Sequence, residues 1–377
     1  MKTILIAPNS FKNCFDSIEV TELISRFLLK KNPQLKKKFK ILKRPISDGG
    51  NGFLDVCKIY FNLELDNYNV TTFNGCNKHV PVGFNFENRI AYFGVSDLIG
   101  DKVLSNGKYG LNPYVYNSAS VGQLLKKLDL INKRRKLFDK VIIGVGGTIT
   151  SDLGLGIMSC FNFKIKRNGE YLPIYPNRYL YAQKTEYEKP DLTYNMEIVT
   201  DVSNPLVGKD GANYSFGFQK GIKRRHLQFF ELGFKNILNL LNVENIENYN
   251  GSGGGVAFAL QYFFGANTIS SQQFIMDLLK IKEIKADYVI TGEGSFDEQT
   301  LLKKGPKIII DYAKKYKANK VFVISGKTST LKDDDIFVYN IQDYFMTQEE
   351  SINKAKVGLE KIVELISTEI IKDSNGK

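Results

Sequence analysis

The residues best suited to chemistry in this chain lie in residues 287–300, DYVITGEGSFDEQT, where carboxylates and glycines are closely spaced. Glu293 stands between two glycines, and Asp297 follows shortly after it. The β-forming residues 288–290 come first, which predicts a strand that ends in a polar turn. Because ligands of open α/β sheets bind at the carboxyl ends of strands, this turn is a candidate binding loop. An ordinary strand-to-helix connection is the alternative.

Five further loops carry glycines or polar side chains of the same kind. They are residues 7–13 (APNSFKN), 47–52 (SDGGNG), 144–156 (GVGGTITSDLGLG), 201–221 (DVSNPLVGKDGANYSFGFQKG) and 251–255 (GSGGG). Glycine lets backbone N–H groups converge on an anion, and carboxylates can hold Mg²⁺ beside it. Phosphoryl transfer needs both, together with a residue that accepts the proton of the substrate hydroxyl. Each loop alone is weak evidence, but their repetition favours phosphoryl transfer.

The elements that must position these loops alternate between strand and helix. Residues 2–7 (KTILIA) predict a strand, and Asp16 or Ser17 can cap the helix that follows. Strand, loop and helix in this order predict a parallel sheet. Further strands are expected at residues 140–145, 288–290 and 320–324, and Thr347 with Glu350 predicts the capping box of a last helix.

Length and composition indicate a two-domain enzyme or binding protein of the cytoplasm. The 377 residues, 43% of them hydrophobic, exceed what a single core usually supports. We find no apolar run of the roughly 20 residues that span a bilayer, and no secretory h-region at the N-terminus. The four cysteines form no CxxC pair, so we expect buried free thiols, and two histidines exclude a multi-histidine metal cluster.

The formal charge of +12 raises the question of nucleic-acid binding. The basic residues cluster only modestly, at residues 30–40 and 223–225, so attraction of small anionic substrates is the favoured interpretation.

Two nucleotide-binding motifs in the chain are incomplete. The GKT at residues 326–328 has Val321 where a P-loop needs its leading glycine, and the GVG at residues 144–146 has Ile149 where a dinucleotide fingerprint needs its third.

Six short motifs, in order and at this separation, resemble those of the glycerate kinase family along nearly the whole chain. They are SFK at residues 10–12, DGG at 48–50, GGT at 146–148 followed by Asp152, NPL at 204–206, FGFQKG at 216–221 and VITGEGSFDEQTL at 289–301. Bacterial members of this family phosphorylate D-glycerate with ATP. The resemblance therefore implies a cytosolic kinase that depends on Mg²⁺ and ATP, acts on a three-carbon hydroxy acid and usually yields the 2-phospho product.

The resemblance also implies a discontinuous α/β architecture. A Rossmann-like parallel-sheet domain is expected from residues 1–66 and 284–377, with a second α/β domain, residues 67–283, inserted into it. The active site would lie in the cleft between the two domains. ATP and D-glycerate, or a related hydroxy acid, are the expected small-molecule partners, and neither a nucleic acid nor a membrane is expected.

The resemblance suggests roles for individual residues. Lys12 could neutralise a phosphate or the carboxylate of glycerate, with a buried salt bridge as the alternative, and Asp152 or Asp201 could accept the hydroxyl proton. Glu293 and Asp297 could hold Mg²⁺. Nucleotide or substrate contacts are expected from Ser10, Asp48, Gly49, Gly50, Gly146, Gly147, Gln219 and Lys220. For each acidic residue, a capping or loop-bracing role stays open.

The chain departs from the family pattern at several of these loops. Where the family usually has Asp, Gly, Ser, Glu, Asn and Gly, this chain has Asn9, Asn13, Cys14, Asn51, Ser151 and Leu153. Two carboxylates have thus become amides, which removes charge if they hold Mg²⁺ but changes little if they brace loops. Three interpretations follow: an active glycerate kinase, a kinase for another small hydroxy acid or sugar acid, and a non-catalytic ligand-binding descendant.

Overall fold

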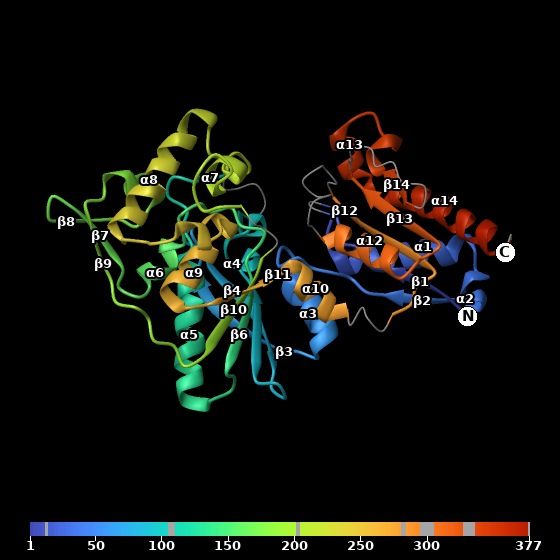
Figure 1. Ribbon diagram of the computed structural model, residues 1–377, viewed down its shortest axis with the longest axis horizontal. Coiled ribbons are helices and arrows are strands. Elements are labelled where there is room, and N and C mark those ends of the chain that lie inside the picture. Colours follow the sequence, from blue (N-terminus) through green and yellow to red (C-terminus); the bar gives the residue numbers. More distant parts are fainter. Residues whose placement is uncertain are drawn as a thin grey trace. The chain divides into compact units, whose positions relative to one another are not determined.

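The computed structural model describes residues 1–11, 14–104, 110–200, 204–279, 284–294, 305–326 and 336–375. The chain folds as two compact α/β units (Figure 1). The first unit contains residues 1–48 and 271–377, and the second contains residues 49–270. We expected boundaries after residues 66 and 283. They lie earlier because β3 (Glu64–Thr71) pairs with β4 (Asn77–Asn85) in the second unit, whereas α10 (Ser271–Leu279) packs on α12 (Gly305–Lys315) in the first.

The first unit is built on a five-stranded parallel sheet in the order β14-β13-β12-β1-β2. Its strands are β1 (Lys2–Ile6), β2 (Phe39–Lys43), β12 (Tyr288–Glu293), β13 (Lys320–Ser325) and β14 (Ile336–Asn340). The strands expected near residues 4, 289 and 322 therefore share one sheet. Their central residues are apolar and fully buried, as a parallel sheet covered on both faces requires.

Helices α1 (Ser17–Lys31) and α14 (Ala355–Asn375) pack against each other in this unit. The carboxylate of Asp16 accepts a hydrogen bond from the Glu19 amide at 2.8 Å, which confirms the expected cap. The last helix differs from the prediction. Thr347 caps only α13 (Gln348–Asn353), and α14 starts as a separate helix after a break at Lys354. A short helix, α2 (Leu35–Lys38), also belongs to this unit.

The second unit is built on a six-stranded mixed sheet in the order β11-β10-β6-β5-β4-β3. Parallel pairs join β11 (Asn267–Ser270), β10 (Asn195–Thr200), β6 (Lys140–Gly144) and β5 (Ile90–Gly94), while β3 and β4 run antiparallel at the other edge. A separate antiparallel sheet, left in Figure 1, contains β7 (Lys164–Arg167), β8 (Glu170–Leu172) and β9 (Lys184–Glu186).

The second unit also contains helices, most of which contribute side chains to its apolar core. They are α3 (Phe53–Phe61), α4 (Ser96–Ile99), α5 (Ala119–Arg135), α6 (Leu155–Ser159), α7 (Ala212–Phe216), α8 (Leu227–Leu240) and α9 (Val256–Phe264). One continuous cluster of buried side chains joins the sheet to α5, α6, α8 and α9. This unit therefore has a core of its own, as has the first.

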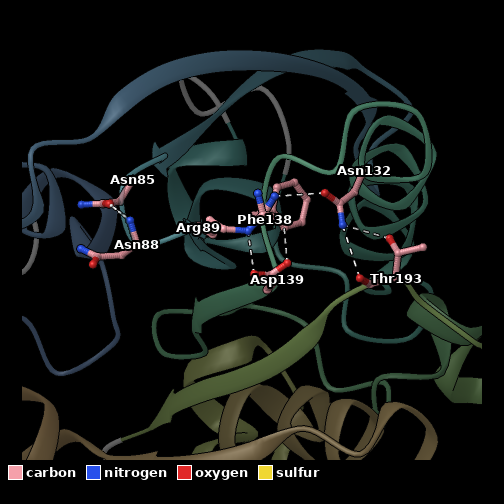
Figure 2. Close-up of polar contacts among 7 residues, drawn as sticks. All are labelled: Asn85, Asn88, Arg89, Asn132, Phe138, Asp139 and Thr193. Atoms are coloured by element: carbon pink, nitrogen blue, oxygen red, sulfur yellow. Dashed lines mark hydrogen bonds and ion pairs between the residues drawn. The ribbon is translucent and has the colours of Figure 1, made fainter.

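Polar contacts fix the start of β6, as Figure 2 shows. Asn132 accepts from the Phe138 amide at 3.1 Å and donates to the Thr193 hydroxyl at 3.1 Å, so one side chain joins the end of α5 to two loops. Arg89 pairs with Asp139 through two hydrogen bonds of 2.7 and 2.8 Å. Both contacts hold the strand that delivers the glycines of residues 144–148.

Two expectations from composition concern the cysteines and the membrane. All four cysteines are free thiols, but only Cys57 is buried, whereas Cys76 is exposed and Cys14 and Cys160 are half-buried. The expectation of buried thiols was therefore wrong for three of them. In the described ranges, every helix is too short or too polar to cross a bilayer.

Candidate active site

Asn9 joins three polar groups at the carboxyl end of the sheet in the first unit. Its backbone amide donates to the Gly292 carbonyl at 2.9 Å, and its side-chain Oδ1 accepts from the Ser10 amide at 2.9 Å. Its Nδ2 donates to Oδ2 of Asp48, also at 2.9 Å. The side chain is only 5% exposed. Asn9 therefore braces the first loop and holds Asp48 in place, which an amide can do and a carboxylate cannot, because the contact needs a donor.

Glu293 is the last residue of β12 and lies opposite Ser325 of β13 in the parallel register. Its side chain is 7% exposed, an unusual environment for a carboxylate at the end of a strand. The preceding Gly292 packs so closely on β13 that an added Cβ would lie 1.9 Å from the Ile324 carbonyl oxygen. The sheet therefore delivers the Glu293 carboxylate at a fixed position.

Carboxylate oxygens suit Mg²⁺, which protein sites typically bind through one or two carboxylates and the phosphates of a substrate. In the ranges that the structure describes, we find no group of three histidine, cysteine or acidic side chains arranged for a metal. Glu293 offers hard oxygen donors in this unit, and Asp297 lies outside the described residues. The Glu293 carboxylate supplies oxygens of the kind that such a magnesium ion takes.

Two glycine loops pack backbone against backbone in the second unit. Gly49 has a φ of +92°, and an added Cβ would lie 2.5 Å from the Val199 carbonyl oxygen. The Gly146 amide donates to the Gly49 carbonyl at 2.8 Å, and a Cβ on Gly146 would meet the Cα of Gly50 at 2.8 Å. The glycines here are needed for close approach. Because its amide is engaged in this contact, Gly146 joins the two loops rather than offering a donor to a phosphate.

Asn51 lies against Gly147, the exposed end of the second loop. A Cβ on Gly147 would come 2.4 Å from Oδ1 of Asn51, and Gly147 itself has a φ of +72°. The amide side chain is therefore packed on the glycine turn, in a space that a longer glutamate side chain could fill only by moving. The Asn51 side chain therefore packs against this glycine loop.

Lys220 brings a buried positive charge to the same loop. It ends the turn η3 (Phe218–Lys220) and is 7% exposed, whereas its neighbour Gln219 is exposed. Its Nζ donates to the Thr148 hydroxyl at 2.9 Å and to the Thr150 carbonyl at 2.6 Å. A buried ammonium interacts more strongly with an incoming anion than an exposed one does, because the surrounding protein screens it less than water does.

Asp152 is the most completely buried carboxylate of this loop, with 0% exposure. It accepts hydrogen bonds from the amide and the hydroxyl of Ser118, both at 2.8 Å, and from the amides of Gly154 and Gly156 at 3.3 and 3.0 Å. Burial raises the pKa of Asp152, and these four donors oppose the rise. A carboxylate so occupied is a brace between the loop and the start of α5, not a group available to a substrate hydroxyl.

The family of the chain follows from comparison with known sequences. The sequence profile of the glycerate kinase family matches residues 4–371. The chain belongs to the glycerate kinase family. It is 31% identical over 314 residues to a glycerate kinase of Neisseria meningitidis, with 80% of each chain covered. It is 26% identical over 344 residues to a glycerate 2-kinase of Escherichia coli, with 88% of this chain and 86% of the other covered.

A solved structure confirms the fold of this glycerate kinase family member. The crystal structure, from Salmonella typhimurium LT2 and assigned as glycerate kinase 2, superposes with a TM-score of 0.71 at 23% identity and covers 99% of both chains. Family membership makes the protein a kinase, a transferase of phosphoryl groups. The α/β fold with mainly parallel sheets that we expected is confirmed.

The residues expected to form the site of this kinase fall into three groups. Ser10, Asp48 and Glu293 lie in the first unit, while Gly49, Gly50, Gly146, Gly147, Asp152, Gln219 and Lys220 lie in the second. Lys12, Asp201 and Asp297 lie outside the described residues. The structure brings Asp48 to Asn9, and Lys220 to the Thr148–Thr150 segment. Thr150 and Asn213 were not expected from the sequence, because a buried hydroxyl or amide has no motif of its own.

Proposed function

We propose that this kinase transfers the γ-phosphoryl group of ATP to a hydroxyl of D-glycerate and releases ADP and 2-phosphoglycerate. The family match over residues 4–371 is the observation that carries the proposal. The relative from Escherichia coli, a glycerate 2-kinase, supports the choice of product. Because ATP is the donor, we place the reaction in the cytoplasm.

The buried ammonium of Lys220 and the glycine turn at Gly147 are the groups we assign to anion binding. The ammonium and the backbone N–H groups of glycine turns both stabilise negative charge on oxygen. We assign Glu293 and Asp297 to hold Mg²⁺. We assign Asp48, which the Asn9 side chain holds in place, to contact the nucleotide or the substrate. When bound, Mg²⁺ would neutralise charge on the phosphates.

We propose that Asp201, rather than Asp152, accepts the proton of the substrate hydroxyl. Asp152 is buried under four donors, so its oxygens are committed to the protein. Asp201 directly follows β10, and carboxyl ends of parallel strands are where substrates of α/β enzymes are bound. We therefore expect Asp201→Asn to lower kcat by about 10²- to 10⁴-fold with little change in ATP affinity.

The decisive experiment measures coupled ADP release with Mg·ATP, with and without D-glycerate, beside a panel of related hydroxy acids and sugar acids. We expect turnover with D-glycerate on the order of 1 to 100 per second. ³¹P NMR against authentic 2- and 3-phosphoglycerate then identifies the product. If only another acid of the panel is turned over, that acid is the substrate instead of D-glycerate. Formation of the 3-phospho isomer would overturn the proposed product.

A further inference from the structure

The side chain of Asn213 has a buried donor whose partner is not supplied by the described residues. Asn213 lies in α7 and is 0% exposed. Its Oδ1 accepts a hydrogen bond from the Ser151 hydroxyl at 2.9 Å, whereas its Nδ2 is buried without a hydrogen-bond partner within residues 1–375 as the structure describes them. Buried amide donors are nearly always paired, so an unpaired one needs an explanation.

A second unpaired group lies on the loop that Asn213 contacts. The hydroxyl of Thr150 is buried and has no partner in the described part of the chain. Thr150 precedes Ser151, and its carbonyl oxygen accepts from the ammonium of Lys220 at 2.6 Å. The loop of residues 148–151 thus carries the unpaired Thr150 hydroxyl and contacts both the Asn213 side chain and the ammonium of Lys220.

The chemistry of these groups selects a small oxygen-rich anion. An amide N–H, a hydroxyl and an ammonium are all donors, and together they match the carboxylate and hydroxyl oxygens of a hydroxy acid. A buried polar site of this kind recognises its ligand strongly, because an analogue without the matching oxygen leaves the protein donors unpaired.

We propose that Asn213 binds the acid substrate, with its Nδ2 donating a hydrogen bond to an oxygen of that acid at the residues 148–151 loop. The inference rests on the proposed function and identifies a side chain that recognises the acid substrate of that reaction. It also accounts for a departure from the family pattern, which usually has asparagine at position 151. Here Ser151 donates to Asn213, so α7 supplies the amide that the loop lacks.

The test compares Asn213→Asp with the wild-type enzyme. The replacement keeps the oxygen that accepts from Ser151 and puts a second oxygen where Nδ2 stands, facing the anion. We expect the KM for D-glycerate and its calorimetric Kd to rise by about 10- to 150-fold, the range for losing a hydrogen bond to a charged group. The Kd for ATP should stay unchanged, because the amide is assigned to the acid alone.

A swap of the two side chains isolates the amide. Asn213→Ser removes it and should weaken acid binding, whereas the double variant Ser151→Asn with Asn213→Ser returns it to the loop and should restore KM to within about threefold. Asn236→Asp is the matched control, since Nδ2 of Asn236 donates to the carbonyls of Tyr179 and Ala182 in the same unit. That variant should lower the melting temperature but leave KM for the acid unchanged.

The possible outcomes separate the inference about Asn213 from the proposed function. If the wild-type enzyme turns over D-glycerate and Asn213→Asp leaves KM and the calorimetric Kd unchanged, the inference is wrong and the proposed function stands. Equal losses in ATP and acid binding, together with a lower melting temperature, would also overturn it, because they indicate a structural role. If another acid of the panel is the substrate, the same comparison is made with that acid. A wild-type enzyme that binds none of the acids refutes both.

Discussion

Asn9 and Asn51 are the two amides that stand where the family pattern usually has carboxylates. Asn9 uses three of its polar groups, since its backbone amide donates to the Gly292 carbonyl, its Oδ1 accepts from the Ser10 amide and its Nδ2 donates to Asp48. Asn51 packs on Gly147. Asn9 therefore braces its loop through hydrogen bonds, and Asn51 packs against the neighbouring glycine turn. The loss of two charges relative to the family pattern is thus compatible with catalysis by the remaining carboxylates.

Asn9→Asp is expected to destabilise the protein. The aspartate would place a carboxylate oxygen where Nδ2 now donates to Asp48, so one hydrogen bond is lost and two like charges face each other. We expect the free energy of unfolding at pH 7 to fall by about 1–3 kcal/mol, measured by urea denaturation. Added Mg²⁺ should recover part of the loss, because a divalent cation can bridge two carboxylates.

The control for this change is Asn69→Asp on the exposed side of β3. This substitution adds the same negative charge on β3, away from Asp48, which is the carboxylate that Asn9 contacts. A surface substitution of this kind usually alters stability by less than about 0.5 kcal/mol. If both variants lose the same amount, the contact between Asn9 and Asp48 contributes nothing specific to the fold.

At the scale of elements, the loop of residues 47–52 depends on close contact with its neighbours. Gly49→Ala combines a positive φ with a contact of 2.5 Å to the Val199 carbonyl oxygen, so the loop must move away from β10. Gly52→Ala is the matched control, because Gly52 has a φ of +78° and open space around its Cα.

We expect Gly52→Ala to cost about 1 kcal/mol of stability, from the strained backbone alone. Gly49→Ala should cost at least about 2 kcal/mol more, by the same strain plus the steric contact. Thermal unfolding of the two variants beside the wild type makes the comparison. Equal losses would show that the packing of the two glycine loops is loose.

Helix α5 carries a pH-dependent contact to the segment before β10. Asp129 accepts from the amide and the hydroxyl of Thr193, both at 3.0 Å, and pairs with Lys133 at 2.7 Å. Burial raises the pKa of Asp129, but the hydrogen bonds from Lys133 and Thr193 outweigh it, so the pKa lies below its usual value.

A carboxyl group whose pKa is lower in the folded than in the unfolded chain stabilises the fold above the unfolded pKa, about 3.9. That contribution is lost as the pH falls through the folded pKa. We therefore expect Asp129→Asn to lower the urea midpoint at pH 7 and the difference from wild type to shrink below about pH 4. Asp210→Asn, on an exposed turn, is the control for the loss of one negative charge.

At the scale of the whole molecule, each unit has its own sheet and its own buried core. The second unit is one continuous stretch of chain, residues 49–270, which contains all six strands of its main sheet. The first unit needs two stretches that are far apart in sequence, because β1 pairs with β12. The two units therefore differ in what they require to fold.

We expect a fragment of residues 49–270 to fold alone. It should give a cooperative thermal transition and dispersed amide resonances, because every strand pair of its sheet lies within it. A shorter fragment of residues 49–194 is the control, since it lacks β10 and β11 and leaves β6 as an edge. A molten 49–270 fragment would show that the second unit depends on the first.

Contiguous stretches of the chain were enough to predict the local elements and the family of the protein. The strands at residues 2–7, 140–145, 288–290 and 320–324 and the cap at Asp16 were predictable, because strand propensity and capping depend on contiguous residues. The glycine and carboxylate loops pointed to phosphoryl transfer for the same local reason. Their likeness to the glycerate kinase motifs extended over residues 4–371, as the family match confirms.

The contacts of the polar side chains in those loops depend on long-range folding of the chain. Asp152 meets Ser118, a residue 34 positions away, and Asn9 meets Asp48, 39 positions away. Asn213 reaches Ser151 across 62 positions. A motif specifies which residue types are present, but whether a buried carboxylate braces a loop or an amide stays open to a ligand depends on which donors the folded chain brings to it.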